Sequence, residues 1–354
     1  MSNYKTDNAT NVRKGEEIDI EKLNLYLQKS AGQVGDILEV TQFAGGFSNL
    51  TYCLKTESKE YVLRRPPFGA NIKSAHDMGR EFKVLSLLKK NYSKVPEPVI
   101  YCEDVEVMNA PFYIMERLQG VILRAANAPK MQLSPEVLRA SSQALIDNLV
   151  VLHGLNIEAT GLIQLGKPEG YVQRQVEGWI KRYYNSETDK IESLDNIAIW
   201  LKANMPVEQP ASFIHNDYKY DNVILNPDNL ADIIGVLDWE MATVGDPLMD
   251  LGGTLAYWSE PGDSDEIKYF NLTWLPGNLT RQEVIARYAD ESGRDVSNIL
   301  FYYIFGLYKN AVIAQQIYAR WKQGYSKDHR FGGLLPIIKG LGSRAVTALQ
   351  TGRV

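Results

Sequence analysis

Residues 214–222 read Ile-His-Asn-Asp-Tyr-Lys-Tyr-Asp-Asn, and residues 236–240 read Val-Leu-Asp-Trp-Glu. Two short apolar segments, Val223–Leu225 and Ile233–Leu237, connect these stretches, and we predict that they pair as a β-hairpin. Because the strands of a hairpin run antiparallel, Asn222 and Asp238 are expected at the same end of it.

The residue types in these two stretches are those that phosphoryl transfer requires. One carboxylate has to accept or orient the proton of an attacking hydroxyl, which suits Asp217. An amide oxygen and a second carboxylate have to hold the Mg²⁺ that bridges the phosphates, which suits Asn222 and Asp238. The alternative is that all three are turn formers, but their spacing and the flanking strands favour the catalytic interpretation. We interpret His215 as a scaffold that hydrogen-bonds the loop.

The sequence before this region indicates a β-rich first lobe. Residues 1–17 are polar and are predicted to be a flexible tail, followed by a short amphipathic helix from about residue 20. A further helix is predicted at Glu81–Leu88. Five strands are expected, at Ile37–Phe43, Thr51–Thr56, Tyr61–Arg65, Val99–Cys102 and Phe112–Met115. We therefore place a nucleotide-binding lobe at residues 18–118.

The sequence after residue 118 is mainly helical, and we assign residues 119–354 to a second lobe that contains the catalytic loop, the metal site and the substrate site. The fold class expected is α+β, with a five-stranded antiparallel sheet and one helix in the first of two lobes. The predicted helices are Pro135–His153, Tyr171–Tyr184, Ile191–Asn204, Pro247–Tyr257, Arg281–Ser292, Val296–Trp321 and Leu334–Leu349.

The composition is that of an ordinary globular protein, with 45% hydrophobic and 23% charged residues. A net charge of −5 gives no electrostatic reason to expect nucleic acid or an anionic membrane as a partner. Cys53 and Cys102 are the two cysteines, too few for a disulfide framework or a cysteine-built zinc site. The N-terminal residues lack the apolar core of a signal peptide and no stretch could span a bilayer, so a cytoplasmic protein is expected.

The motifs resemble those of the aminoglycoside phosphotransferase family, which has a bilobal protein-kinase-like fold. The chain is similar in particular to the branch found beside, or fused to, acyl-CoA dehydrogenases. Six segments carry the resemblance in the expected order: FAGGFSNLTY (43–52), YVLRRPP (61–67), REFKVLSLL (80–88), YIMERLQG (113–120), HNDYKYDNVIL (215–225) and VLDWEMATVGDPLMDLG (236–252).

The resemblance implies ATP and Mg²⁺ as cofactors and assigns a role to several residues. Glu81 would pair with the cation of the third strand, and Met115 would line the adenine pocket. The backbone of Glu116 and Leu118 would hydrogen-bond the purine edge. Backbone N–H groups of the first turn would cover the phosphates, at Gly45, Gly46, Phe47 and Ser48. Asp246 is expected to cap the following helix, and Asp250 to hydrogen-bond the catalytic loop.

Two departures from the family pattern affect the interpretation. The third-strand lysine is replaced by Arg64, which can also pair with phosphate and with Glu81, through a bidentate fork. Arg65 is the competing candidate, because a shift of one residue turns a strand side chain to the other face. Asp238 is followed by Trp-Glu, and the segment before Asp246 is short, so no platform for a peptide substrate remains.

The acceptor is expected to lie against the second lobe near Asp217, and we predict a small molecule. Candidate contacts are polar residues within two predicted helices: Arg174, Trp179, Lys181, Arg182, Tyr303, Lys309, Gln315 and Gln316. The plainer interpretation is that these helices pack through an apolar stripe and that the charges are solvated. The Arg174, Lys181 and Arg182 group favours an anionic or CoA-linked acceptor, with a hydroxyacyl-CoA as the leading candidate.

We therefore expect an ATP- and Mg²⁺-dependent phosphotransferase that phosphorylates a hydroxyl of a small metabolite, with Asp217 as the base and Arg64 with Glu81 as the phosphate-positioning pair. Two alternatives stay open. An aminoglycoside-type antibiotic kinase should show a dense acidic cluster in the second lobe, which the sequence lacks. A nucleotide-binding pseudokinase would fit the Arg64 replacement, but the complete set of Asp217, Asn222 and Asp238 argues against it.

Overall fold

The computed structural model describes residues 4–43, 49–68, 77–269, 271–325 and 328–354. Its contacts divide the chain into two compact units. The first consists of residues 1–122, 223–229 and 233–241, and the second of residues 123–222, 230–232 and 242–354. The first unit thus includes a segment from far along the chain, and this segment carries Asp238.

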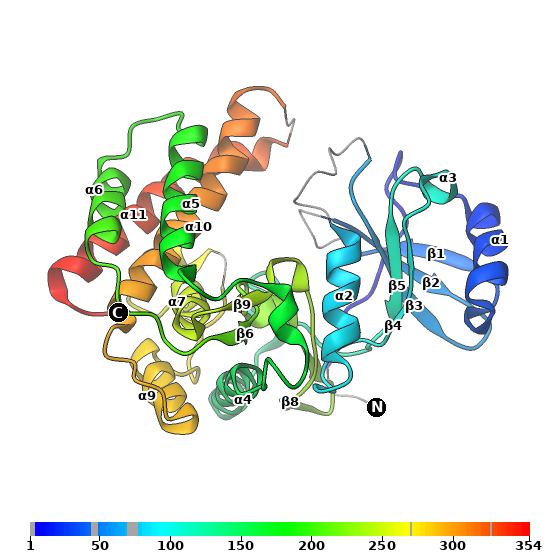
Figure 1. The fold of residues 1–354 in the computed structure, drawn as a ribbon, viewed down its shortest axis with the longest axis horizontal. Coiled ribbons are helices and arrows are strands. Elements are labelled where there is room, and N and C mark those ends of the chain that lie inside the picture. The colour runs from blue at the N-terminus through cyan, green and yellow to red at the C-terminus, as the bar shows by residue number, and fades with distance from the viewer. Residues whose placement is uncertain (1–3, 44–48, 69–76, 270, 326–327) are drawn as a thin grey trace. The chain divides into compact units, whose positions relative to one another are not determined.

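An antiparallel sheet of five strands forms the centre of the first unit, in the order β1-β2-β3-β5-β4. Figure 1 shows two helices, α1 (Ile20–Ser30) and α3 (Val105–Met108), on one side of this sheet and α2 (Met78–Leu88) on the other. The strands are β1 (Glu39–Gln42), β2 (Leu50–Lys55), β3 (Glu60–Arg65), β4 (Pro98–Cys102) and β5 (Phe112–Glu116). The predicted number of strands in this sheet and their antiparallel pairing are confirmed.

Alternation along the strands decides which residues form the core of this unit. Side chains of even-numbered β2 residues and odd-numbered β3 residues pack under α1, in a cluster that includes Tyr52, Leu54 and Leu63. Successive strand residues point to opposite faces, so Cys53, Val62 and Arg64 lie on the other face. The apolar face stabilises the sheet, and the opposite face is left for polar chemistry.

The predicted hairpin forms from β7 (Val223–Asn226) and β8 (Asn229–Val236), with Val223 paired to Val236. It packs against residues 118–121, where Val121 and Leu225 exchange backbone hydrogen bonds of 2.8 Å. Gly120 permits this approach, because a Cβ there would lie 2.4 Å from Ile224 Cγ2 and 2.6 Å from the Leu225 oxygen.

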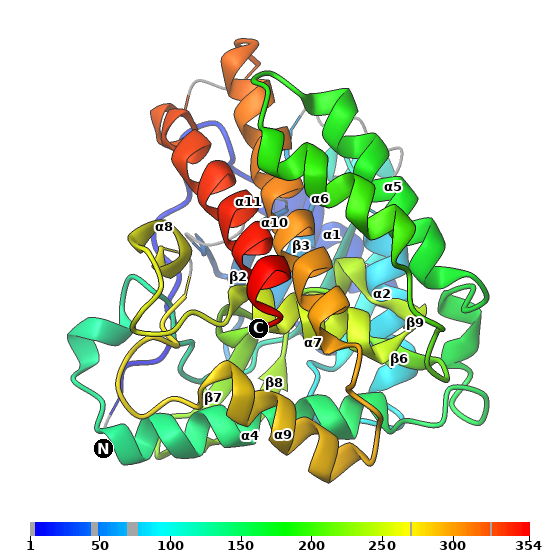
Figure 2. The same ribbon diagram turned by 90° about the vertical axis from the view of Figure 1, so that its left-hand side faces the viewer.

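The second unit is built from helices. In Figure 2, α4 (Pro135–His153) and α9 (Arg281–Ser292) lie side by side, and the long α10 (Ile299–Lys322) runs beside α5 (Tyr171–Ser186) and α11 (Leu334–Thr351). The others are α6 (Glu192–Ala203), α7 (Pro247–Tyr257) and α8 (Asp265–Lys268). Among the described residues, none of the helices combines the length and the apolar character that crossing a membrane requires. The α+β fold class is confirmed.

Two short strands of this unit were not predicted. β6 (Ser212–Ile214) pairs antiparallel with β9 (Thr243–Gly245), directly before the catalytic loop and after Asp238. Three residues are too few to produce a recognisable alternation, so only the pairing identifies them as strands. The N-terminal residues 4–17, predicted as a solvated tail, have no buried side chain, yet Thr10 forms a β-bridge with Gln42.

Candidate active site

Arg64 is the centre of a buried ion-pair set in the first unit. Its Nη1 donates to Glu81 Oε1 of α2, and its Nη2 donates to Asp238 Oδ1 at 3.2 Å. Glu81 and Arg64 are 1% and 8% exposed, whereas about a third of the Asp238 side chain is exposed. The structure therefore brings together three predicted residues from a strand, a helix and the segment after the hairpin.

The charges of this set stabilise one another. Burial alone would lower the pKa of Arg64, but Glu81 and Asp238 outweigh that effect and hold the pKa above its usual value. Arg64 is accordingly a permanent cation with a carboxylate on each side. A lysine could not contact both carboxylates through a planar fork, so the arginine is suited to this arrangement.

Arg65, the competing candidate, points to the other face of the sheet. It is 2% exposed, and its Nη1 donates to the Met108 oxygen at 2.9 Å and its Nε to the Pro66 oxygen at 3.1 Å. Its guanidinium also lies 3.8 Å from the ring centroid of Phe68. Arg65 thus supports the packing around α3, and Arg64 is the arginine that meets Glu81.

The predicted nucleotide contacts fall partly outside the described residues: this applies to Gly45, Gly46, Phe47 and Ser48. Met115 is buried on β5 beside Val62, on the same face as Arg64. The Glu116 N–H donates to the Glu97 oxygen at 2.8 Å, so this N–H is engaged within the first unit. Leu118 packs against Gly235 of the hairpin.

Asp217 occupies a loop of the second unit between β6 and the hairpin, where two side chains hold its carboxylate. Lys219 Nζ lies 2.9 Å from Oδ1 and 2.8 Å from Oδ2. Asn222 Nδ2 donates to Oδ2 at 2.9 Å and to the Asp217 main-chain oxygen at 2.8 Å. The carboxylate is fixed in position and keeps about a fifth of its side-chain surface exposed.

Lys219 also sets the charge of this site. Burial would raise the pKa of Asp217, but the Lys219 ammonium outweighs it and holds that pKa below its usual value. The pKa of Lys219 is raised, because Asp217 and Tyr257 overcome the effect of its burial. The ammonium lies 4.3 Å from the centroid of the Tyr257 ring. Asp217 is therefore ionised at neutral pH and able to accept a hydrogen bond from a hydroxyl.

Asp250 of α7 holds the backbone of the loop that carries Asp217. Its Oδ2 accepts from the His215 N–H at 2.6 Å and its Oδ1 from the Asn216 N–H at 2.8 Å. His153 Nε2 lies 3.2 Å from Oδ2. The predicted bond between Asp250 and the loop is confirmed, as is the cap at Asp246, whose side chain accepts from the Leu248 N–H.

His215 is fully buried, and its Nδ1 accepts the Asp217 N–H at 3.2 Å, which agrees with a scaffold role. Asn216 and Asp238 both have a φ of 67°, a left-handed conformation that asparagine and aspartate adopt more readily than most residues. Such backbone conformations cost about 1–3 kcal/mol and persist where the surroundings enforce them. Asp250 provides that restraint for Asn216.

Lys309 is a buried cation of α10 that reaches the same loop. Its Nζ donates to the Asn216 oxygen at 2.7 Å and lies 5.7 Å from the centroid of the Trp179 ring. Burial lowers the pKa of Lys309, whereas the charges of Asp217 and Asp250 oppose that fall. Lys309 is therefore a second lysine held against the loop, on the side that faces α5 and α10.

The other predicted acceptor contacts have different surroundings. Arg174 donates to the main-chain oxygens of Lys167 and Glu169, so its guanidinium organises the start of α5. Lys181 and Arg182 are exposed, and the Arg182 guanidinium stacks 4.7 Å from the centroid of Trp179.

On α10, Tyr303 accepts from Arg344 Nε at 3.0 Å, and Gln315 Nε2 donates to the Ser186 oxygen at 2.7 Å. Gln316 is half-buried. Tyr303 and Gln315 thus join α10 to neighbouring segments, and Lys309 is the member of the predicted set that bonds to the catalytic loop.

Asn222 of the second unit and Asp238 of the first each have an oxygen of the kind that Mg²⁺ binds. Hard cations prefer oxygen ligands, and Mg²⁺ is commonly held by one or two carboxylates together with substrate phosphates. Asn222 gives its Nδ2 hydrogens to Asp217, which leaves its Oδ1 as the ligand atom, and Asp238 has an accessible carboxylate. In the described part of the chain no three His, Cys, Asp or Glu side chains cluster as a metal cage.

Lys219 is the main functional residue that the sequence interpretation missed. The sequence does place Lys219 close to the proposed base, because it stands two residues after Asp217 in the same loop. A lysine in an exposed-looking turn gave no reason to expect a buried ion pair, because lysines are usually solvated. Only the fold of residues 217–222 brings its ammonium onto the carboxylate.

Comparisons with known proteins agree with this geometry. Residues 39–285 match the model of the phosphotransferase enzyme family. Acyl-CoA dehydrogenase family member 11 of Rattus norvegicus is 34% identical over 316 residues, which cover 87% of this chain and 40% of that relative. The chain thus spans less than half the length of that relative.

Among the solved structures that share the fold are two that match over most of both chains. A candidate aminoglycoside phosphotransferase from Ralstonia eutropha is 28% identical, with a TM-score of 0.78 over 94% of this chain and 99% of that one. A thermostable aminoglycoside phosphotransferase mutant, solved as a ternary complex with AMP-PNP and hygromycin B, is 15% identical with a TM-score of 0.58, over 92% of this chain and 98% of that one.

Proposed function

We propose that this chain, which belongs to the phosphotransferase enzyme family, transfers the terminal phosphoryl group of ATP to a hydroxyl of a small anionic molecule. The observation that carries the proposal is the bridging of Glu81 and Asp238 by Arg64, because it places a fixed cation beside an accessible carboxylate. Such a pair can position phosphates and hold the ion that accompanies them.

The chain's own residues divide the work between the two units. Arg64 binds phosphate oxygens and is held in place by Glu81. Asp217 accepts a hydrogen bond from the acceptor hydroxyl, and Lys219 keeps the carboxylate ionised. The carboxylate takes the proton of the hydroxyl as the new P–O bond forms and the bond from the terminal phosphorus to its bridging oxygen breaks, which releases ADP. Asn222 Oδ1 and Asp238 would hold Mg²⁺, which neutralises charge on the phosphates.

Two buried or half-buried lysines motivate the choice of an anionic acceptor. Lys219 and Lys309 lie around Asp217, and the Asp250 carboxylate is occupied by three partners. A cationic acceptor would have to approach these lysines without new compensating carboxylates, which costs free energy. The name of the 34% identical relative suggests a hydroxyacyl-CoA as the first acceptor to try.

A direct test incubates the protein with Mg-ATP and a panel of hydroxyacyl-CoAs, free hydroxy acids and aminoglycosides, with phosphorylated product detected by mass. The proposal expects product from a carboxylate or CoA ester that carries a hydroxyl. Turnover of aminoglycosides with none on the anionic compounds would support an antibiotic kinase instead. Tight nucleotide binding without turnover of any compound would support a pseudokinase.

A further inference from the structure

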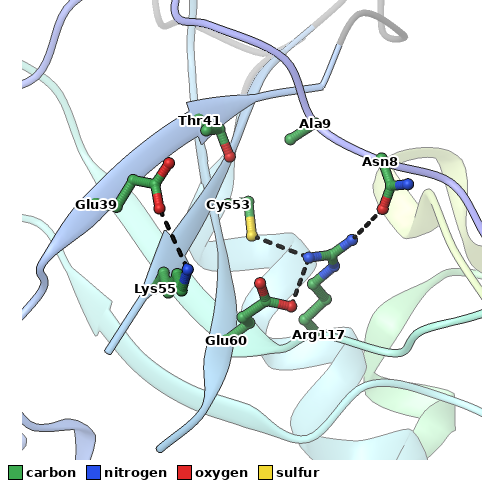
Figure 3. Close-up of a pocket in the computed structure, with 8 residues that line it drawn as sticks. All are labelled: Asn8, Ala9, Glu39, Thr41, Cys53, Lys55, Glu60 and Arg117. Carbon is green, nitrogen blue, oxygen red and sulfur yellow. Dashed lines mark hydrogen bonds and ion pairs between the residues drawn. The ribbon is translucent and has the colours of Figure 1, made fainter. Parts of the chain in front are cut away.

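Two lysine–carboxylate pairs of this chain differ in how their ammonium groups are held. Lys55 pairs with Glu39 at 3.4 Å beside a cavity of about 240 Å³ (Figure 3), and both side chains are more than half exposed. Such exposed pairs contribute little, because water competes for both charges. Lys219 lies 2.8 Å from Asp217 Oδ2, and both of these side chains are about a fifth exposed. The position of this shielded ammonium therefore depends on the groups around it.

Helix α7 supplies those groups, and its residues contact the catalytic loop in order. Asp250 accepts the first two N–H groups of the loop, and Thr254 Oγ1 donates to the Tyr218 oxygen at 2.9 Å. The Tyr257 ring then meets Lys219, whose Nζ lies 4.3 Å from the ring centroid. Residues 250, 254 and 257 are spaced four and three apart, so they share one face of α7.

The residue after Lys219 is attached at the same end of α7. The ring of Tyr220 stacks on that of Trp258, directly after the helix, with the centroids 6.1 Å apart. Helix α7 itself is fixed against α10, because Gly252 lies so close to the Tyr302 backbone that a Cβ there would collide with it. The loop around Lys219 is thus held along a helix that has little freedom to move.

The ring of Tyr257 attracts the ammonium without adding a charge. A cation is attracted to the face of an aromatic ring within roughly 6 Å of the centroid, and Lys219 is inside that distance. Burial raises the pKa of Tyr257, and the charge of Asp217 raises it further, so the phenol stays protonated. The ring can therefore hold the ammonium in place without competing as a second carboxylate would.

The position of the ammonium decides which part of the Asp217 carboxylate can meet an acceptor. Oδ2 accepts from Lys219 at 2.8 Å and from Asn222 at 2.9 Å, whereas Oδ1 accepts from Lys219 at 2.9 Å. Each carboxylate oxygen has about two acceptor positions. Oδ1 thus has a position for the acceptor hydroxyl, in a direction that the ammonium determines.

We propose that Tyr257 is a positioning residue, whose ring keeps the Lys219 ammonium on Asp217 and so directs Oδ1 to the acceptor hydroxyl. The inference rests on the proposed function, because it concerns the same carboxylate. It assigns to Tyr257 an effect on kcat that acts through Lys219 and leaves the affinity for nucleotide unchanged.

Two substitutions separate the ring from its hydroxyl. With Mg-ATP and a hydroxyacyl-CoA as substrates, we expect kcat to fall about fivefold in Tyr257→Leu, the scale of one cation–π contact, with the KM for ATP unchanged. Tyr257→Phe keeps the ring and should keep the wild-type kcat. Thermal unfolding checks that the variants fold, and Tyr257→Met replaces the leucine variant if that one does not.

Tyr318→Leu is the matched control, because Tyr318 stands beside another lysine–aspartate pair of the second unit. Lys322 lies 2.8 Å from Asp189, and its Nζ is 5.7 Å from the centroid of the Tyr318 ring. Loss of this ring should leave kcat unchanged. A fivefold fall in this variant as well would show a general loss of packing and would overturn the inference.

A double-mutant cycle tests whether Tyr257 acts through Lys219. Added to Lys219→Met, Tyr257→Leu should lower kcat no further, because the interaction that it removes is already absent. A second fivefold fall in the double variant would show that the ring acts by another route, and the inference would be wrong.

Acetylation of Lys219 gives a readout independent of turnover. Mass spectrometry of the intact chain's peptides measures its rate relative to the exposed Lys59. Because the ring confines the ammonium, we expect Lys219 to react about fivefold faster in Tyr257→Leu and at the wild-type rate in Tyr257→Phe. Equal rates in all three proteins would contradict the proposed contact.

The outcomes separate this inference from the proposed function. If the intact chain phosphorylates neither hydroxyacyl-CoAs nor free hydroxy acids, the proposed function fails and this inference fails with it. If the intact chain is active and Tyr257→Leu keeps the wild-type kcat, the inference alone is overturned.

Discussion

The Arg64 set of the first unit and the Asp217 loop of the second hold their charges by different means. Arg64 contacts two carboxylates from rigid elements, a helix and the end of a hairpin. Asp217 is held by Lys219 and Asn222 of its own loop. The backbone of that loop donates hydrogen bonds to the buried Asp250. The proposed nucleotide binding thus depends on sheet geometry, whereas the proposed proton transfer depends on a short loop with a restrained backbone.

Asp238→Ala should produce the largest effect, because it removes both a partner of Arg64 and the proposed metal ligand. Mg²⁺-dependent turnover is expected to be abolished, together with the Mg²⁺ dependence of AMP-PNP binding. Measuring Kd with and without Mg²⁺ checks this on the folded variant. Unchanged Mg²⁺-dependent turnover would contradict the assignment of Asp238 as a metal ligand and the role proposed for the Arg64 set.

Asp217→Asn should separate the two sets most cleanly. We expect kcat to fall by roughly 10²-fold or more, the usual scale for a positioned proton acceptor, with the Kd for nucleotide nearly unchanged. Asparagine keeps the shape but cannot take a proton. Loss of nucleotide binding with kcat retained at saturation would show that the roles of the two sets are reversed.

Arg64→Lys tests whether the two donors of the Arg64 guanidinium contribute to nucleotide affinity. Lysine keeps the charge but cannot contact Glu81 and Asp238 through two parallel donors, so nucleotide affinity should fall roughly tenfold, the scale of one lost charged hydrogen bond. Arg65→Lys is the matched control: it changes the neighbouring residue on the other face of β3 and should alter thermal unfolding without altering nucleotide Kd. Equal losses of affinity in both variants would contradict the assignment.

The smallest expected effect is a displacement of the pH profile. In the wild type Lys219 holds the pKa of Asp217 down against burial, so the carboxylate stays ionised and kcat is retained as the pH falls. In Lys219→Met the largest influence that opposes burial is lost, and Lys309 opposes it less strongly, so the acid limb of kcat should move to higher pH. Lys219→Arg keeps the charge and should keep the wild-type limb. An identical limb in all three proteins would disprove the coupling.

The local sequence predicted much of what the structure contains. Asp246-Pro247 specified a cap and first turn through residue chemistry alone, and the strands of the first unit followed from apolar runs bounded by turns. The loop residues Asp217 and Asn222 stood out because their spacing is rare. Such signals depend on neighbours within a few residues, so they survive without knowledge of the fold.

The sequence left open which of two neighbouring arginines on β3 faces α2. Arg64 and Arg65 were both candidates, since a sequence gives alternation but not which face meets α2. The position of Glu81, contributed by α2, decides for Arg64, and the packing of α3 occupies Arg65. Similarly, nothing in the sequence indicated that Arg174 donates to the main-chain oxygens of Lys167 and Glu169, just before its own helix.

The sequence by itself determined the order of the elements, the loop that carries Asp217 and the residue types that suit phosphoryl transfer. Only the tertiary structure brought Lys309 to the Asn216 carbonyl, Asp250 to the backbone of the loop and Thr10 to Gln42 of β1. These contacts join residues far apart in the chain. Their free energy comes from burial and hydrogen bonds that exist only once the elements have packed.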